Sequence, residues 1–303
     1  MTTGREGPGE ERQTERRASV WVEVSLILTV FFFGTNFVAV KTVVEVVPPV
    51  LFAAIRFTLV GLLMLGILRL IEPETRLKRA DFLPILGLGF VGISCTQTVF
   101  TIGVGETTAA NTAVIYATAP VWGMVLGFLL GLERPRLLGI AGIALCLFGV
   151  LVMEYGSIDL EGTSLLGDLL ILCAAVFWGS YTVLSIPLLR DYSPLTVATY
   201  SILLGGVMVI PISLVDLDVD YADLTGLIWF AALYSALLSS GFGFFGWQRG
   251  VAAVGANRVL IYQYLIALTG ITAGIVLLGE TFGPGQIAGA AIILLGVYLA
   301  RRK

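Results

Sequence analysis

The sequence predicts an all-α integral membrane protein with ten transmembrane helices, arranged as two five-helix repeats of inverted topology. Hydrophobic residues make up 57% of the 303 residues and charged residues only 13%, with a mean hydropathy of +0.95. In soluble domains about a quarter of the residues are charged. The chain contains ten long apolar runs, and its second half repeats its first at an offset of 145 to 147 residues. An odd number of helices in each copy forces the two copies into opposite orientations.

Each apolar run is long enough for a helix to cross the hydrocarbon core, which takes roughly 20 residues. Residues 1–20 are polar and rich in Gly, Glu and Arg, so we expect a disordered tail there. The first repeat then covers residues 21–154 and the second covers residues 164–303. The tail leads into a full-length span, which is not the pattern of a cleavable signal peptide. The expected spans are 22–43, 48–70, 82–103, 107–130, 135–153, 164–184, 194–215, 224–248, 255–278 and 284–300.

The positions of Lys and Arg predict the orientation of these spans, because basic residues concentrate in cytoplasmic loops. With the N-terminus inside, all but two of the 18 basic residues fall in the tail, the inner loops or the C-terminus. The two exceptions, Lys41 and Arg56, lie within spans. The outer loops carry only acids, such as Asp216 and Asp218. We therefore expect a multi-pass plasma-membrane protein with cytoplasmic N- and C-termini.

Several classes of protein and site are disfavoured by composition. A nucleic-acid partner is not expected, because the chain has no basic face with interleaved aromatic residues. Histidine is absent, and Cys95, Cys146 and Cys173 fall in apolar runs at unrelated spacings, so neither a metal site nor a disulfide framework is expected. Phosphate-loop motifs are also absent, and we expect no cofactor. The outer loops are too short for a large docking surface. The sequence does not define the oligomeric state, and a monomer is compatible with it.

The repeat can be followed residue by residue. Between Tyr116 and Gly123 its register shifts by one, next to Pro120, which removes a helical hydrogen bond. Irregular backbone is therefore expected in the fourth or the ninth span, covered by protein or lining a cavity. The matches at offset 145 are Gly34, Val38, Pro49 and Gly61 with Gly179, Val183, Pro194 and Gly206; at 146, Ala110, Asn111 and Tyr116 with Ala256, Asn257 and Tyr262; at 147, Gly123, Glu133 and Gly142 with Gly270, Glu280 and Gly289.

Arg56 is the most informative polar residue, because it lies near the bilayer centre, roughly 12 Å into its span at about 1.5 Å per residue. A charge there costs at least about 2.5 kcal/mol unless it faces water or a partner. Arg56 therefore faces a substrate or makes an internal structural pair. Lys41 could attract an anion, snorkel to headgroups or pair with Glu45. Together the two cations would favour a carboxylate in the outer part of a cavity.

Other polar and aromatic residues within spans are expected to line that cavity, although each could instead hydrogen-bond one helix to another. These substrate-binding candidates are Asn36, Gln97, Tyr116, Trp178, Tyr181, Tyr200, Tyr262 and Gln263. Asn111 and Asn257 begin their helices, which favours capping or interhelical bonding. Pro120, Glu133 and Glu280 are candidates for gating or helix-end roles. Glycines four residues apart, such as Gly123 and Gly127, predict close helix packing.

These residues resemble the EamA-like, ten-helix branch of the drug/metabolite transporter superfamily from Trp21 to Ala300. The family's opening pattern is similar to residues 33–41, followed by Arg56, and its later signatures resemble Ala110-Asn111 and Gly279-Glu280. The resemblance implies a secondary transporter that exports or exchanges small metabolites, such as amino acids, by alternating access. The second copy departs from the first, with Ile186 and Ser201 in place of Lys41 and Arg56.

A passive channel and a membrane-embedded enzyme are the alternatives to a carrier. A passive channel would share a polar lumen, and only transport kinetics separate it from a carrier. A membrane-embedded enzyme is less favoured, because no general acid–base pair occurs within the spans. Acidic residues cluster near helix ends, which favours a facilitator or exchanger over a proton-driven carrier, with proton coupling through Glu45 or Glu106 still open.

Overall fold

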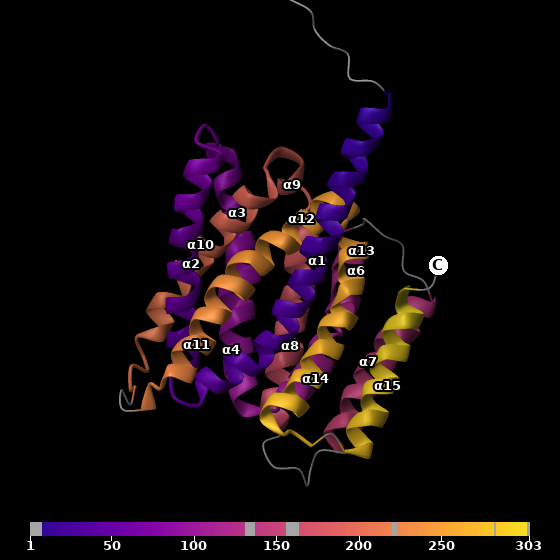
Figure 1. Ribbon diagram of the computed structural model, residues 1–303. Helices are drawn as coiled ribbons and strands as arrows, with labels where there is room; N and C mark the ends of the chain where they lie inside the picture. The colour runs from indigo at the N-terminus through magenta and orange to yellow at the C-terminus, as the bar shows by residue number, and fades with distance from the viewer. Residues whose placement is uncertain (1–7, 131–136, 156–163, 220–222, 282, 302–303) are drawn as a thin grey trace, which may run out of the picture.

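The computed structural model describes residues 8–130, 137–155, 164–219, 223–281 and 283–301, and within these ranges it contains helices and connecting turns but no strand (Figure 1). Eight helical segments are long and apolar enough to cross a membrane. They correspond to predicted spans one to four and six to nine. The segments are Val20–Val44, Pro49–Ile71, Arg79–Glu106, Ala109–Leu129, Leu165–Asp191, Pro194–Ser213, Gly226–Val254 and Leu260–Leu278.

Several of these segments are built from consecutive shorter elements. The bounds in the first half are α1 Pro8–Val44, α2 Pro49–Ile71, η1 Arg79–Asp81, α3 Phe82–Gly89, η2 Phe90–Cys95, α4 Thr96–Glu106, α5 Ala109–Tyr116, α6 Ala119–Leu129 and α7 Leu137–Tyr155. Those in the second half are α8 Leu165–Leu184, α9 Leu188–Asp191, α10 Pro194–Ser213, α11 Gly226–Tyr234, η4 Ser235–Gly243, α12 Phe244–Val254, α13 Ala256–Val259, η5 Leu260–Tyr262, α14 Gln263–Leu278 and α15 Pro284–Arg301.

Helices α7 and α15 stand where spans five and ten were predicted. They have 19 and 18 residues and run side by side at the edge of the bundle (Figure 1). Gly149 of α7 is tightly packed against α15, because an added Cβ would lie 2.8 Å from the Ile293 backbone nitrogen. The two helices therefore form a closely packed pair.

Helix α1 begins at Pro8, inside the segment for which composition predicted a disordered tail. Proline is favoured in the first turn of a helix, and the Glu, Arg and Gln residues that follow are good helix formers. The low hydrophobicity of these residues predicted disorder. In the structure they instead continue the helix of the first span.

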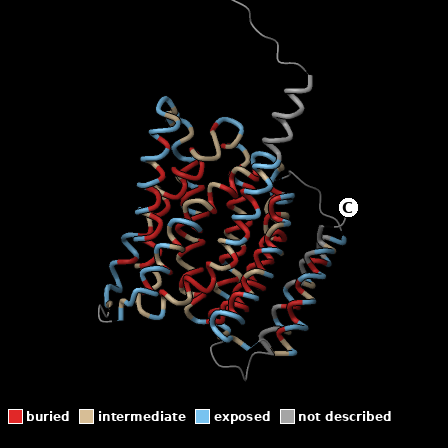
Figure 2. The backbone as a smooth tube through the Cα atoms, in the orientation of Figure 1, coloured by how far each residue is buried: buried red, intermediate tan, exposed pale blue. Residues whose placement is uncertain are grey.

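The outside of the bundle is apolar and its interior holds polar residues. Large exposed side chains include Leu59, Phe230 and Leu268. Figure 2 shows that buried residues follow the middle of the bundle, and several of them are polar, Arg56 and Asn111 among them. This distribution is expected for helices that face lipid on one side and a protein interior on the other.

The segments at predicted spans four and nine, Ala109–Leu129 and Leu260–Leu278, both contain irregular backbone, which the register shift predicted for one of the two. Ala117 and Thr118 form a turn between α5 and α6, and Pro120 lies in the first turn of α6, where its missing N–H costs no hydrogen bond. At the start of Leu260–Leu278 the 3₁₀ turn η5 separates α13 from α14.

The segments at predicted spans three and eight, Arg79–Glu106 and Gly226–Val254, contain the π-helical stretches η2 and η4, which the sequence did not predict. Each wide turn has a hydroxyl that donates to the carbonyl five residues earlier. Thr96 Oγ1 lies 2.7 Å from the Val91 oxygen, and Ser240 Oγ lies 3.1 Å from the Ser235 oxygen. Such π-turns often occur at functional sites.

Glycines allow the helices of the two halves to come into backbone contact. A Cβ at Gly179 of α8 would overlap the Ala119 carbonyl and lie 2.7 Å from the Gly123 nitrogen, both on α6. A Cβ at Gly61 of α2 would lie 2.6 Å from the Leu203 Cα on α10. Close approach of this kind is what small residues contribute in membrane helices.

Loop residues of the two halves also meet at the end of the bundle where α2 finishes. Tyr192 donates a 2.6 Å hydrogen bond to Asp81 Oδ2 and accepts a 3.0 Å bond from the Lys78 N–H. Burial raises the pKa of the Tyr192 phenol, and its bond to the Asp81 carboxylate acts in the same direction. This contact therefore involves a protonated phenol.

Candidate functional site

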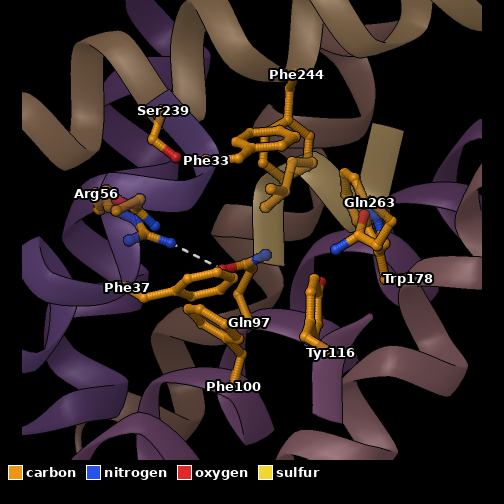
Figure 3. A pocket seen from close by; sticks show the side chains of 12 residues that line it. Phe33, Phe37, Arg56, Gln97, Phe100, Tyr116, Trp178, Ser239, Phe244 and Gln263 are labelled. Atoms are coloured by element: carbon orange, nitrogen blue, oxygen red, sulfur yellow. Dashed lines mark hydrogen bonds between the residues drawn. The ribbon is translucent and has the colours of Figure 1, made fainter. Parts of the chain in front are cut away.

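A small cavity of about 30 Å³ lies in the middle of the bundle (Figure 3). Both halves of the chain contribute to it, through α1, α2, α4 and α5 of the first half and α8, η4, α12 and α14 of the second. The lining residues are Phe33, Asn36, Phe37, Arg56, Gln97, Phe100, Tyr116, Trp178, Ser239, Phe244, Gln263 and Ile266.

Arg56 is the charged group of this cavity, and its side chain is only 3% exposed. Its Nη1 donates to Ser235 Oγ at 2.6 Å, and its Nη2 donates to Gln97 Oε1 at 2.8 Å. The carbon between these nitrogens lies 4.4 Å from the ring centre of Phe57 and 5.2 Å from that of Phe52. The guanidinium is thus held by neutral oxygens and aromatic faces.

Ser235 links Arg56 to Asn36. Its hydroxyl donates a 2.6 Å hydrogen bond to Asn36 Oδ1, so that Arg56, Ser235 and Asn36 form one buried chain of hydrogen bonds. Ser235 is the first residue of the π-helical segment η4. The segment therefore contacts the only charged side chain among the residues that line the cavity.

Aromatic rings form most of the remaining wall. The Trp178 ring stacks on Tyr181 at 5.3 Å between centres and meets Phe244 edge-on at 5.2 Å. Phe100 meets Tyr116 at 5.4 Å. These contacts give the cavity rigid apolar sides beside its polar residues.

The cavity gathers Asn36, Arg56, Gln97, Tyr116, Trp178 and Gln263 from the residues predicted for it. Tyr181 lies behind Trp178 and bonds Ser201 at 3.2 Å, while Tyr262 is half-buried outside the lining. Tyr200 accepts a 3.2 Å bond from Arg69 near the end of α2. Pro120 lies in the first turn of α6 and outside the lining, and Glu133 falls outside the described residues.

Lys41, predicted as a second cation of the cavity, is absent from its lining and instead binds the end of α4. Its Nζ donates to the carbonyls of Gly105 at 2.9 Å and Thr107 at 2.8 Å. Carbonyls at the end of a helix lack helical partners, and the helix dipole favours a cation there. The ammonium thus acts as a helix cap in this structure.

Glu280 makes the complementary contact with the start of α5. Its two carboxylate oxygens accept hydrogen bonds from the N–H groups of Ala109 at 2.7 Å and Ala110 at 2.8 Å. Gly279, which ends α14 with a φ of 67°, turns the chain just before it. The helix-end role proposed for Glu280 thus corresponds to a cap on a helix of the other half.

A buried polar cluster lies beside this cap. Asp168 of α8 is 1% exposed and accepts hydrogen bonds from Thr107 Oγ1 at 2.7 Å and from Asn111 Nδ2 at 3.2 Å. Asn111 Oδ1 accepts from Gln286 Nε2 of α15 at 2.5 Å. Asn111 therefore bonds between helices, one of the two roles expected for it, and Thr108 supplies the side-chain cap of α5.

The sequence missed the apolar members of the site, the lining residue Ser239, and two polar residues outside the lining. Phe33, Phe37, Phe100, Phe244 and Ile266 lie in apolar spans, where nothing distinguishes a cavity residue from a lipid-facing one. Ser235 and Asp168 carried a weak signal, a polar side chain inside or at the start of a span. The residue type alone did not show their partners, which are far apart in sequence.

Apolar helices that enclose a polar central cavity are typical of membrane transporters. The model of the EamA-like transporter family matches residues 20–155 and 165–302, and the chain therefore belongs to that family. It is a multi-pass membrane protein of a family of transporters, not of enzymes.

Curated relatives cover most of the chain. An uncharacterized transporter of Archaeoglobus fulgidus is 28% identical over 92% of this chain and 98% of its own length. A probable amino-acid metabolite efflux pump of Salmonella typhimurium is 28% identical, covering 90% of this chain and 92% of the pump. A probable terminal-alkyne amino-acid exporter of Streptantibioticus cattleyicolor is 29% identical over 75% and 76%.

A solved crystal structure also shares this fold. It superimposes with a TM-score of 0.67 at 18% sequence identity, over 93% of this chain and 97% of the other. At this identity the likeness concerns the fold alone.

Proposed function

We propose that the protein is a secondary transporter that moves small carboxylate-bearing metabolites, such as amino acids, across the plasma membrane by export or exchange. The observation that carries this proposal is Arg56, a buried guanidinium whose hydrogen bonds go to neutral oxygens. A buried charge is costly unless it meets an opposite charge or water. A carboxylate entering the cavity supplies that charge.

The printed names of two relatives support the same substrate class. One is a probable amino-acid metabolite efflux pump and the other a probable terminal-alkyne amino-acid exporter. Amino acids share a carboxylate, which suits Arg56, and many carry an apolar side chain, which suits the aromatic walls of the cavity.

The proposed architecture has ten transmembrane helices, with α7 and α15 as the fifth and tenth. The two five-helix halves have inverted topology, and both termini are cytoplasmic, which agrees with the distribution of basic residues. A monomer suffices, because one chain supplies every residue that lines the cavity.

Alternating access requires contacts between the halves that can break and re-form on each side of the cavity. The cap of Glu280 on α5 is such a contact at one end of the bundle, and the bond of Tyr192 to Asp81 is one at the other end. In the proposed topology the first is extracellular and the second cytoplasmic.

The variant Arg56→Gln tests the function. Purified protein in proteoliposomes is assayed with radiolabelled L-alanine, L-leucine and L-phenylalanine. We expect kcat/KM to fall by at least about tenfold, because a hydrogen bond to a charged group contributes about 1.5–3 kcal/mol.

Arg69→Gln is the matched control, since Arg69 lies on the same helix but is exposed near its end. We expect this variant to keep its uptake. Unchanged uptake by Arg56→Gln, with insertion and folding intact, would refute the proposed role of the cavity.

A further inference from the structure

The hydrogen bonds around Arg56 fix the direction of two neighbouring amides. An arginine side chain only donates, so whichever group meets it must present an acceptor. Gln97 must therefore present Oε1, which lies 2.8 Å from Nη2, and Ser235 must present an oxygen lone pair to Nη1. The single proton of the Ser235 hydroxyl is then free to be donated to Asn36 Oδ1, 2.6 Å away.

This order leaves the amino groups of both amides on the opposite side from Arg56 and Ser235. Asn36 and Gln97 both line the cavity, and Figure 3 shows the oxygen of Gln97 directed at Arg56 with its nitrogen on the far side. Two further N–H groups of lining residues, Arg56 Nε and Trp178 Nε1, have no hydrogen-bond partner within the described ranges. One acceptor of the lining, Gln263 Oε1, also has no partner within those ranges, so the lining offers more free N–H donors than free acceptors.

We propose that Ser235 is a positioning residue that gives this cavity its preference for a carboxylate over a neutral amide. Its hydroxyl accepts from Arg56 and donates to Asn36 Oδ1. Because the Asn36 oxygen is then occupied, the Asn36 amino group is left to donate to the substrate's carboxylate oxygen. This inference rests on the proposed function, in which Arg56 binds that carboxylate.

The location of Ser235 suits such a role. Its side chain is fully buried, and its own carbonyl accepts a 3.1 Å hydrogen bond from Ser240 Oγ, which helps to hold the first turn of η4 in place. Without the hydroxyl, the Asn36 amide could rotate and present its oxygen to the cavity, where it would repel a carboxylate.

The second repeat does not contain this relay. At the offset of 145, Asn36 corresponds to Tyr181 and Arg56 to Ser201, and these two side chains bond each other directly at 3.2 Å. Tyr181 also lies against Gly92 of η2, where no side chain intervenes. The donors named above therefore belong to the first-half residues Asn36, Arg56 and Gln97 and to Trp178 of α8.

The test measures the preference for an acid over the corresponding amide. Uptake of L-alanine, L-leucine and L-phenylalanine into proteoliposomes is compared with uptake of their carboxamides, for the wild-type protein, Ser235→Ala, Ser235→Thr and Asn36→Asp. Ser94→Ala is the matched control, because Ser94 is a buried serine of the other π-helical segment and donates to the Gly205 carbonyl at 2.8 Å.

We expect the wild-type protein and Ser94→Ala to prefer the acids. Ser235→Ala should lower the acid-to-amide ratio of kcat/KM by about tenfold, the effect of one hydrogen bond to a charged group. Ser235→Thr, which keeps the hydroxyl, should restore the ratio. Asn36→Asp, which replaces the donor with an acceptor, should lower it further.

A Ser235→Ala protein that is folded, transports the acids and keeps the wild-type ratio overturns the relay and leaves the role of Arg56 intact. If Ser235→Ala does not fold, an unchanged ratio in Asn36→Asp overturns it instead. A wild-type protein without any preference for the acids overturns both this inference and the proposed function.

Discussion

At the scale of single residues, a polar side chain inside an apolar span was the most informative signal. Arg56, Asn36 and Gln97 are polar residues in apolar spans, which predicted either a cavity or hydrogen bonds between helices, and in the structure they line the cavity and also make such bonds. Lys41 carried a similar signal, yet its partners are carbonyls 64 and 66 residues away. Only the fold brings those carbonyls to the ammonium, so no local pattern could have assigned Lys41 to a helix cap.

Glu280 allows a test of the cap between the halves. Glu280→Gln replaces one carboxylate oxygen with an amino group that cannot accept from a backbone N–H. We expect a loss of about 1 kcal/mol in the free energy of unfolding, typical of a lost helix cap. Thermal unfolding in detergent measures this change.

Glu74→Gln is the control, because it removes a carboxylate that is exposed on the surface. If Glu280→Gln unfolds at the same temperature as Glu74→Gln and the wild type, Glu280 does not stabilise α5.

At the scale of elements, proline and glycine positions were predictive and the π-turns were not. Pro120 and the register shift predicted the break between α5 and α6. The wide turns of η2 and η4 depend on Thr96 and Ser240 reaching back five residues, and hydroxyls are common in membrane helices that remain regular. A hydroxyl at such a position therefore does not predict a π-turn by itself.

Gly179→Ala tests the contact between α8 and α6. The new methyl group would overlap the Ala119 carbonyl, which belongs to the backbone and cannot rotate away. We expect a loss of about 1–3 kcal/mol, the usual cost of overpacking, measured as a lower unfolding temperature.

Gly66→Ala provides the comparison, because nothing lies within 4 Å of a Cβ at that exposed position of α2. Alanine is the better helix former, so this variant should be as stable as the wild type or more so. Equal stability of the two alanine variants would mean that α6 and α8 are not closely packed at Gly179.

At the scale of the whole molecule, the class of fold was predictable from the sequence. The sequence also predicted ten spans, which is two more than the described residues establish. Hydropathy predicted a helical membrane protein, and eight helices meet the length and composition of a span. Helices α7 and α15 match the other two predicted spans in position. The shape of the cavity was not predictable, because it depends on which faces of eight different elements meet at the centre.

In alternating access, a cavity between the halves carries one substrate at a time and opens to either side in turn. Counterflow in proteoliposomes distinguishes this mechanism from a passive pore. Vesicles loaded with unlabelled L-leucine are diluted into labelled L-leucine, and the same is done with L-alanine and L-phenylalanine. We expect transient accumulation of label above equilibrium that saturates with concentration and is lost in Arg56→Gln. Entry of label that only equilibrates, at a rate independent of the unlabelled amino acid inside, would contradict it.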